Sequence, residues 1–143
     1  MLIRRALFIC TGNYYRSRVA EILFNAIAGG AGLDWKADSR GTAVGHGNVG
    51  PMSRQAIEWL RTRGIKTDGD LRFPLQLQTD DLAHADLVIA LNESEHRPYL
   101  EEQFPQWAGR VAYWHIADLG LAPLEEALTA IEREVRQLVR RLC

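Results

Sequence analysis

The 143-residue sequence predicts an α/β fold, in which a parallel sheet is covered by helices on both faces. Short apolar runs alternate along the chain with segments of helical periodicity, and glycine or proline marks the ends of several helical segments. No repeat, low-complexity tract or linker interrupts this alternation. We therefore expect residues 1–143 to form a single domain, which is long enough to bury a core.

The first half of the chain contains two expected strands and two expected helices. The apolar run Leu2–Ile9 indicates a strand, and from Ser17 the apolar residues fall on one face of a helix that ends at two glycines, 29 and 30. Residues 33–38 indicate a second strand. A proline at position 51 and Gly64 bracket a second helix, which is the usual order of these two residues.

The second half repeats this alternation. Residues 79–85 (TDDLAHA) indicate a short capped turn, and the run ADLVIAL at 85–91 indicates a buried strand. A helix is expected over 93–104 and a fourth strand over 110–116. The clearest helix covers 123–142, where apolar residues recur on one side.

Composition excludes several classes of function. The chain has 17 Lys+Arg against 18 Asp+Glu, so its net charge of -1 provides no basic surface for general nucleic-acid binding. No apolar run approaches membrane-spanning length, and no signal peptide is expected. Two cysteines at opposite ends cannot form a disulfide framework, so we expect a cytoplasmic protein with a reduced Cys10. Its 4 histidines lack ligand spacing, so no metal is expected.

The segment CTGNYYRS lies where the first strand ends and the first helix begins, which is where ligands bind in parallel sheets. Loop amides and the helix N-terminus together form an anion site. Gly12 permits a positive φ, and Asn13 tolerates one. Arg16 offers a planar fork for two phosphate oxygens. The same positive field favours the thiolate of Cys10, to which the Ser17 hydroxyl can donate.

Two interpretations of Cys10 remain open from these residues alone. A free cysteine usually behaves as a small core residue, and Arg16 could follow it by chance. A nucleophile held against a tetrahedral oxyanion is the alternative. The preceding strand, the following helix, the internal Gly-Asn and the serine after Arg16 favour the nucleophile.

CTGNYYRS resembles the phosphate loop of the low-molecular-weight protein tyrosine phosphatases, Cys-x-Gly-Asn-x-Cys-Arg-Ser-Pro near the N-terminus. DSRGT at 38–42 is similar to the family's Ser-Ala-Gly-Thr segment, and HADLVIALNESEHR at 84–97 to the stretch after its third strand. YWHIAD at 113–118 is similar to the lead-in to the family's Asp-Pro general acid. The resemblance covers nearly the whole chain. It implies a three-layer fold with a four-stranded parallel sheet in the order 2-1-3-4.

The resemblance also implies residue roles. Cys10 would be the nucleophile, Arg16 the phosphate clamp and Ser17 the partner of the thiolate, while Asn13 and Ser39 would brace the loop. The residues expected to bind phosphate or support the loop are Thr11, Gly12, Asn13, Tyr14, Tyr15, Ser17 and Ser39.

Asp118 would protonate the leaving oxygen, as the family's general acid does. From its position after an apolar strand, an ordinary turn aspartate is the alternative. Leu119 replaces the family's proline here, and the next two residues replace aromatics of the phosphotyrosine pocket.

Other departures fall in and around the loop. Tyr15 replaces the second loop cysteine, so no disulfide can shield Cys10, and Arg18 replaces a proline. Arg72 falls where a loop-bracing histidine is usual. Tyr14 or Tyr15 could stack on an aryl phosphate in place of the missing aromatics, or could simply cover apolar surface.

The expected function is a cysteine-dependent phosphomonoesterase, most simply a protein-tyrosine phosphatase with a phosphocysteine intermediate and no cofactor. Its substrate would be a tyrosine-phosphorylated protein or a small aryl phosphate. Two alternatives stay open. One is an arsenate reductase that uses an external thiol, since 86–98 contains no shuttle cysteine. The other is a catalytically weak member that binds phosphate or a phosphoprotein.

Overall fold

The structure is a computed structural model that describes residues 2–45, 47–67, 71–117 and 123–143. Its elements, in chain order, are β1 (Arg4–Cys10), α1 (Arg16–Gly30), β2 (Trp35–Gly41), α2 (Arg54–Thr62), α3 (Thr79–Ala83), β3 (Leu87–Ala90), α4 (Glu93–Gln103), α5 (Pro105–Ala108), β4 (Ala112–Tyr113) and α6 (Leu124–Leu142).

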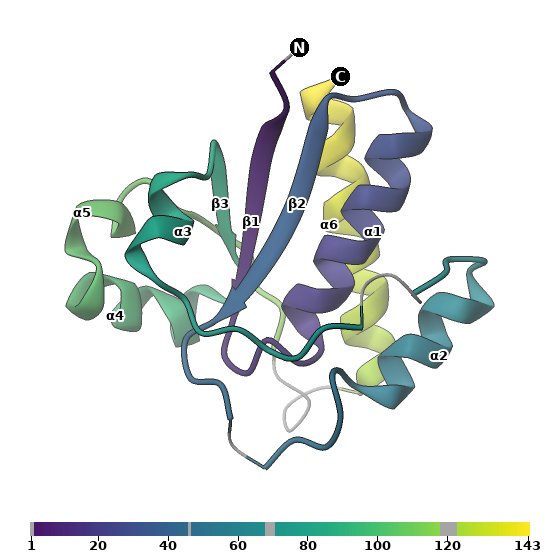
Figure 1. The fold of residues 1–143 in the computed structure, drawn as a ribbon, viewed down its shortest axis with the longest axis horizontal. Helices are drawn as coiled ribbons and strands as arrows, with labels where there is room; N and C mark the ends of the chain where they lie inside the picture. Colours follow the sequence, from purple (N-terminus) through teal and green to yellow (C-terminus); the bar gives the residue numbers. More distant parts are fainter. Residues whose placement is uncertain (1, 46, 68–70, 118–122) are drawn as a thin grey trace.

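The four strands form one parallel sheet in the order β2-β1-β3-β4, which confirms the expected topology. β1 lies at its centre and pairs with β2 over its full length, so that Cys10 is opposite Gly41. All four strands point the same way, and their carboxyl ends therefore meet at one edge (Figure 1). The loop that follows Cys10 lies at this edge.

Helices cover both faces of the sheet, as Figure 1 shows. Alternate residues of β1 point to opposite faces. Ala6 and Phe8 join a core formed with α1, α2 and α6. Leu7 and Ile9 join a second core with α3, α4 and α5. β1 is thus buried on both sides, as the central strand of a parallel sheet should be.

Several boundaries differ from those the sequence predicts. β2 continues to Gly41 rather than ending at 38, and β4 contains two residues rather than seven. α2 begins after Ser53, whose side chain accepts a hydrogen bond from the Ala56 amide, so serine and not proline caps this helix. α5 was not predicted. The differences in β2 and α2 lie at element ends, where sequence patterns are weakest.

Candidate active site

The loop of residues 11–15 joins β1 directly to the first turn of α1. Asn13 has a φ of 52°, the left-handed conformation expected for it. Gly12 does not use the positive φ that a glycine permits. Its missing side chain instead leaves room for Asn48, whose Nδ2 would lie 3.3 Å from a Cβ at position 12.

The backbone after β2 orients the peptide groups of the loop. The amides of Thr42 and Ala43 donate to the carbonyl oxygens of Cys10 and Thr11, each at 2.9 Å, and the carbonyl of Tyr14 accepts from residue 53. In a planar trans peptide the N–H group points opposite to the C=O group. The amides of residues 11, 12 and 15 therefore point away from these segments, which is one condition for an anion-binding nest.

Cys10 ends β1 with only 2% of its surface exposed, yet its sulfur has polar partners. Sγ lies 3.0 Å from Oγ of Ser17 and accepts from the Asn13 amide at 3.3 Å. Oγ of Ser17 also accepts a hydrogen from Nδ2 of Asn13, at 2.8 Å. The Ser17 hydroxyl can therefore direct its own proton to the sulfur. Two hydrogen-bond donors therefore face the sulfur of Cys10 at the N-terminus of α1.

Arg16 is almost fully buried and forms a two-pronged ion pair with Glu95, the third residue of α4. Nη1 donates to Oε2 at 2.8 Å and Nη2 to Oε1 at 2.9 Å. Nη1 also donates to the carbonyl oxygen of Ile116, at 2.9 Å. Burial opposes the charge of Glu95, but the hydrogen bonds and charge of Arg16 outweigh it, so the pKa of Glu95 lies below its ordinary value. The carboxyl group is therefore ionised at neutral pH.

Thr11 connects this ion pair to a buried histidine. Its hydroxyl donates to Oε1 of Glu95 at 3.2 Å, and its Oγ1 lies 3.1 Å from Nε2 of His96. Nδ1 of His96 accepts from the amide of Asn92. Because Nδ1 accepts, the proton of the neutral ring is on Nε2, which donates to Thr11. The chain of donors thus runs from His96 through Thr11 to Glu95.

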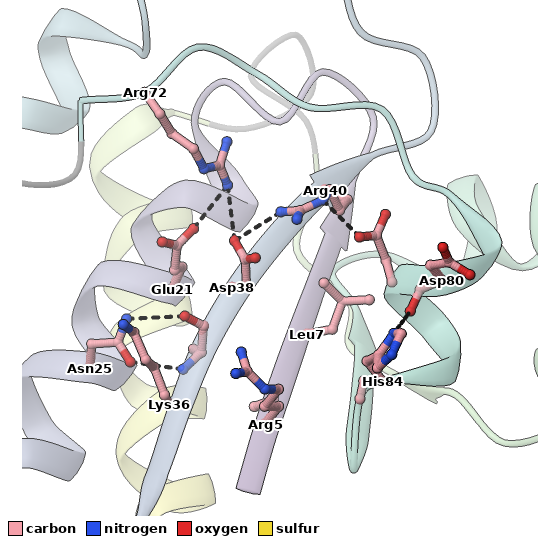
Figure 2. A pocket seen from close by; sticks show the side chains of 14 residues that line it. Arg5, Leu7, Glu21, Asn25, Lys36, Asp38, Arg40, Arg72, Asp80 and His84 are labelled. Carbon is pink, nitrogen blue, oxygen red and sulfur yellow. Dashed lines mark hydrogen bonds and ion pairs between the residues drawn. The ribbon is translucent and has the colours of Figure 1, made fainter. Parts of the chain in front are cut away.

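A second network supports the loop from the side of β2. Nδ2 of Asn13 donates to Oγ of Ser39 at 2.9 Å, and the Ser39 hydroxyl donates to Glu21 at 2.6 Å. Arg72 donates to Oδ1 of Asn13 at 3.0 Å and to both oxygen atoms of Ser39. It also pairs with Glu21 and Asp38 (Figure 2). The structure thus brings Arg72 into the bracing position that the resemblance implies.

The two carboxyl groups beside Arg72 have opposite pKa shifts. Burial raises the pKa of Glu21 above its ordinary 4.5, despite the hydrogen bond from Ser39 and the charge of Arg72. Burial acts in the same direction on Asp38, but hydrogen bonds from Arg40 and the Ser39 amide outweigh it and hold the pKa of Asp38 below 3.8. The folded state is therefore stabilised by the protonated form of Glu21 and by the ionised form of Asp38.

We expect Arg72→Met to lower the free energy of unfolding by about 2–3 kcal/mol at pH 7, because two carboxylates lose their shared cation. The stabilising contribution of Asp38 is present above pH 3.8 and is lost as pH falls through its lowered pKa. That of Glu21 is complete below pH 4.5 and is lost as pH rises through its raised pKa, a loss that Arg72 limits. The difference between variant and wild type should therefore shrink on acidification towards pH 4.

Urea unfolding between pH 4 and 7 measures this difference. Arg61→Met is the matched control, because Arg61 forms an exposed pair with Glu58 on α2. Such surface pairs contribute little, so this variant should lose less than about 0.5 kcal/mol at every pH. A cost for Arg72→Met that grew on acidification would contradict the expectation.

Arg72, Glu21 and Asp38 also line a polar groove of about 620 Å³ over β1 and β2 (Figure 2). Arg40 continues the chain of charges along its wall to Asp81 of α3. Neither Cys10 nor Arg16 lines this groove. The candidate catalytic residues therefore lie outside the groove. Arg72 connects the two regions, because it lines the groove and also donates to Asn13 of the loop.

The two loop tyrosines have different surroundings. Tyr15 is 5% exposed and packs in the core formed by α1, α2 and α6, so its ring cannot form the wall of an open substrate site. Tyr14 is half-buried, and its hydroxyl donates to the carbonyl of Val49. Only Tyr14 of this pair is placed to meet a ligand at the rim.

Arg18, in the family's proline position, is 1% exposed and lies inside the protein. It donates to the carbonyl oxygens of Pro51 and Arg72, at 2.9 and 2.8 Å. It thereby links the start of α1 to the two segments that flank the loop. The sequence alone offered no role for this side chain.

Asp118, the expected general acid, lies outside the described residues, as do positions 119–121 and His46. Ile116, two residues before Asp118, contacts Arg16 through its carbonyl oxygen. Across the described ranges, no group of three or more His, Cys, Asp or Glu is placed to hold a metal ion. Within the same ranges, no helix is long and apolar enough to cross a membrane.

Sequence reasoning missed Glu95 and His96. One signal could have identified their helix start: Asn92 followed three residues later by a glutamate is a capping pattern, and the side chain of Asn92 does accept from the Glu95 amide. In that pattern the glutamate turns back to the cap. Here it turns towards Arg16, 79 positions earlier, which no local pattern indicates.

Comparisons with known proteins agree with this geometry. Residues 5–143 match the family model of low molecular weight phosphotyrosine protein phosphatases. The low molecular weight protein tyrosine phosphatase of T. tengcongensis has a similar structure, with a TM-score of 0.83 and 33% identity over 96% of this chain and 99% of that one. The structure of YfkJ of Bacillus subtilis is also similar, with a TM-score of 0.85 and 27% identity over 99% of this chain and 96% of that one. A protein-arginine-phosphatase of Bacillus subtilis is 35% identical over 73% of this chain and 66% of its own length.

Proposed function

Because this chain belongs to the low molecular weight phosphotyrosine protein phosphatase family, we propose that it hydrolyses phosphotyrosine in proteins through a covalent intermediate on Cys10. The observation that carries the proposal is the sulfur of Cys10, which faces the Ser17 hydroxyl and the Asn13 amide at the start of α1. A structural cysteine in a core needs no such donors. A nucleophilic thiolate does.

The reaction takes two steps. The thiolate of Cys10 attacks phosphorus, the bond from phosphorus to the tyrosine oxygen breaks, and Asp118 protonates that oxygen. Asp118, now a carboxylate, then takes a proton from water as the water oxygen attacks phosphorus, and the thiolate leaves from phosphate. Loop amides and Arg16 hold the three equatorial oxygens in both steps. No electrons are transferred and no cofactor takes part.

Turnover of p-nitrophenyl phosphate, followed by acid quenching with labelled substrate, tests this proposal. The expected result is steady hydrolysis and a labelled protein whose phosphate is on Cys10. Phosphate binding without turnover would favour the catalytically weak binding protein instead. Arsenate-dependent oxidation of an added thiol, without phosphoester hydrolysis, would favour the reductase.

Phosphopeptides identify the substrate class. Peptides that contain phosphotyrosine should be hydrolysed faster than matched phosphoserine peptides, because an aryl ring can contact the half-buried Tyr14 at the rim. Preferential hydrolysis of phosphoarginine would instead place the chain with its arginine-phosphatase relative. We expect the protein to act in the cytoplasm, where reducing conditions keep Cys10 a thiol.

We expect Asp118→Asn to lower turnover of phenyl phosphate by about 10²–10⁴-fold, because phenoxide leaves slowly without a proton. p-Nitrophenyl phosphate, which has a better leaving group, should be affected less. Inhibition by inorganic phosphate should change little, since binding depends on the loop and Arg16. Unchanged turnover of phenyl phosphate would remove Asp118 from the mechanism.

A further inference from the structure

We propose that Glu95 is a positioning residue, which fixes the guanidinium plane of Arg16 for the transition state of the phosphatase reaction. The inference rests on the proposed function and adds to it a residue from the start of α4. Glu95 contacts Arg16 and Thr11, one on either side of the loop's turn.

The shape of the Arg16 guanidinium allows Glu95 to position this group without competing with the substrate phosphate for it. Glu95 takes one hydrogen from each terminal nitrogen of Arg16, and the carbonyl of Ile116 takes another from Nη1. All three contacts use the end of the fork formed by the two terminal nitrogens. A phosphate that binds through the Nε–Nη2 edge does not have to displace Glu95. Three contacts on one end fix the plane of a rigid planar group, and thus the direction of its other edge.

Glu95 is itself held in place. The Asn92 side chain accepts from its amide, and the Thr11 hydroxyl donates to its Oε1. Nε2 of His96 in turn contacts the hydroxyl oxygen of Thr11. The Glu95 side chain is 29% exposed and that of Arg16 is 3% exposed, so this ion pair lies where solvent screens it weakly. The cation is thus held by a carboxylate that has few alternative positions.

Glu93 provides an internal comparison on the same turn of α4. It also pairs with an arginine, Arg97, at 2.7 Å, but both side chains are exposed. Exposed pairs of this kind contribute little to stability or function. The two glutamates therefore have the same helix and chemistry but differ in the arginine that they contact. An effect specific to Glu95 therefore comes from its contacts with Arg16 and Thr11, which Glu93 lacks.

The test compares Glu95→Gln with Glu93→Gln. Glu95→Gln should lower kcat for p-nitrophenyl phosphate by about 10–10²-fold. The amide NH₂ of glutamine cannot accept a hydrogen bond, so one terminal nitrogen of Arg16 loses its partner and the guanidinium plane is no longer fixed. Inhibition by vanadate, which binds as a five-coordinate mimic of the transition state, should weaken by a similar factor. Inhibition by inorganic phosphate should change less than about threefold, since the loop amides still bind the ground-state anion. Glu93→Gln should match wild type throughout.

A double-mutant cycle with Arg16→Lys separates positioning from a general structural role. If Glu95 acts through Arg16, Glu95→Gln should change turnover less than about twofold in the Arg16→Lys background. Equal losses in both backgrounds would overturn the inference, as would a wild-type kcat for Glu95→Gln. So would a parallel loss of kcat, phosphate binding and thermal stability. If Glu95→Gln fails to fold, Glu95→Ala, which adds no donor, replaces it.

The wild-type protein distinguishes this inference from the proposed function. If wild type does not hydrolyse p-nitrophenyl phosphate, the proposed function fails. If wild type is active and Glu95→Gln equals it, only the role of Glu95 fails.

Discussion

Cys10→Ser is expected to lower turnover of p-nitrophenyl phosphate by about 10⁴-fold or more, because an unactivated serine hydroxyl is a far weaker nucleophile than sulfur. The Ser17 hydroxyl and Asn13 amide that face the sulfur stabilise an anion. They cannot make an alkoxide accessible at neutral pH. The phosphocysteine intermediate should also disappear, since the bond from phosphorus to sulfur cannot form.

Phosphate binding should survive this substitution. Arg16, the amides of residues 11, 12 and 15 and the side-chain contacts of Asn13 do not involve the sulfur, so calorimetry should give a phosphate affinity within about threefold of wild type. Cys143→Ser is the matched control, because Cys143 is exposed at the end of the chain, and it should retain full activity. Activity of Cys10→Ser above about 1% of wild type would exclude Cys10 as the nucleophile.

Arg16→Lys is expected to lower kcat/KM by about 10³-fold, the second largest effect. Lysine keeps the charge but presents no planar fork, so it cannot donate to both oxygens of Glu95, to the Ile116 carbonyl and to phosphate together. The carboxylate of Glu95 would then lie beside the loop without its two-pronged partner. Both kcat and phosphate affinity should fall, in contrast to the effect of Cys10→Ser.

Arg97→Lys is the matched control for replacing a planar guanidinium group by an ammonium group. Arg97 pairs with Glu93 and Glu101 on the exposed face of α4, where lysine can replace it. This variant should keep wild-type kinetics and thermal stability. If Arg16→Lys kept kcat/KM within about tenfold of wild type, a point charge would suffice, and bidentate phosphate binding by Arg16 would be wrong.

Much of the fold could be predicted from local patterns. The apolar run before Cys10, the helical periodicity after Ser17 and the long apolar face of α6 each indicate an element, and the structure contains all three. Alternation of strands and helices indicates a parallel sheet, but its order came from a family resemblance. The two-residue β4 and the short α5 were not foreseen, because each depends on packing against α4 and β3 more than on its own pattern.

The sequence by itself determined the elements, the loop between β1 and α1, and the chemistry that Cys10 and Arg16 bring to it, because periodicity, capping and residue type act within one or two turns of chain. Only the tertiary structure decided that Glu95 pairs with Arg16, that Arg72 reaches Asn13, and that the Tyr15 ring is buried. These partners lie far apart along the chain. They meet because β1 pairs with β3 on one side and with β2 on the other, so that the segments after each strand converge at the carboxyl edge of the sheet.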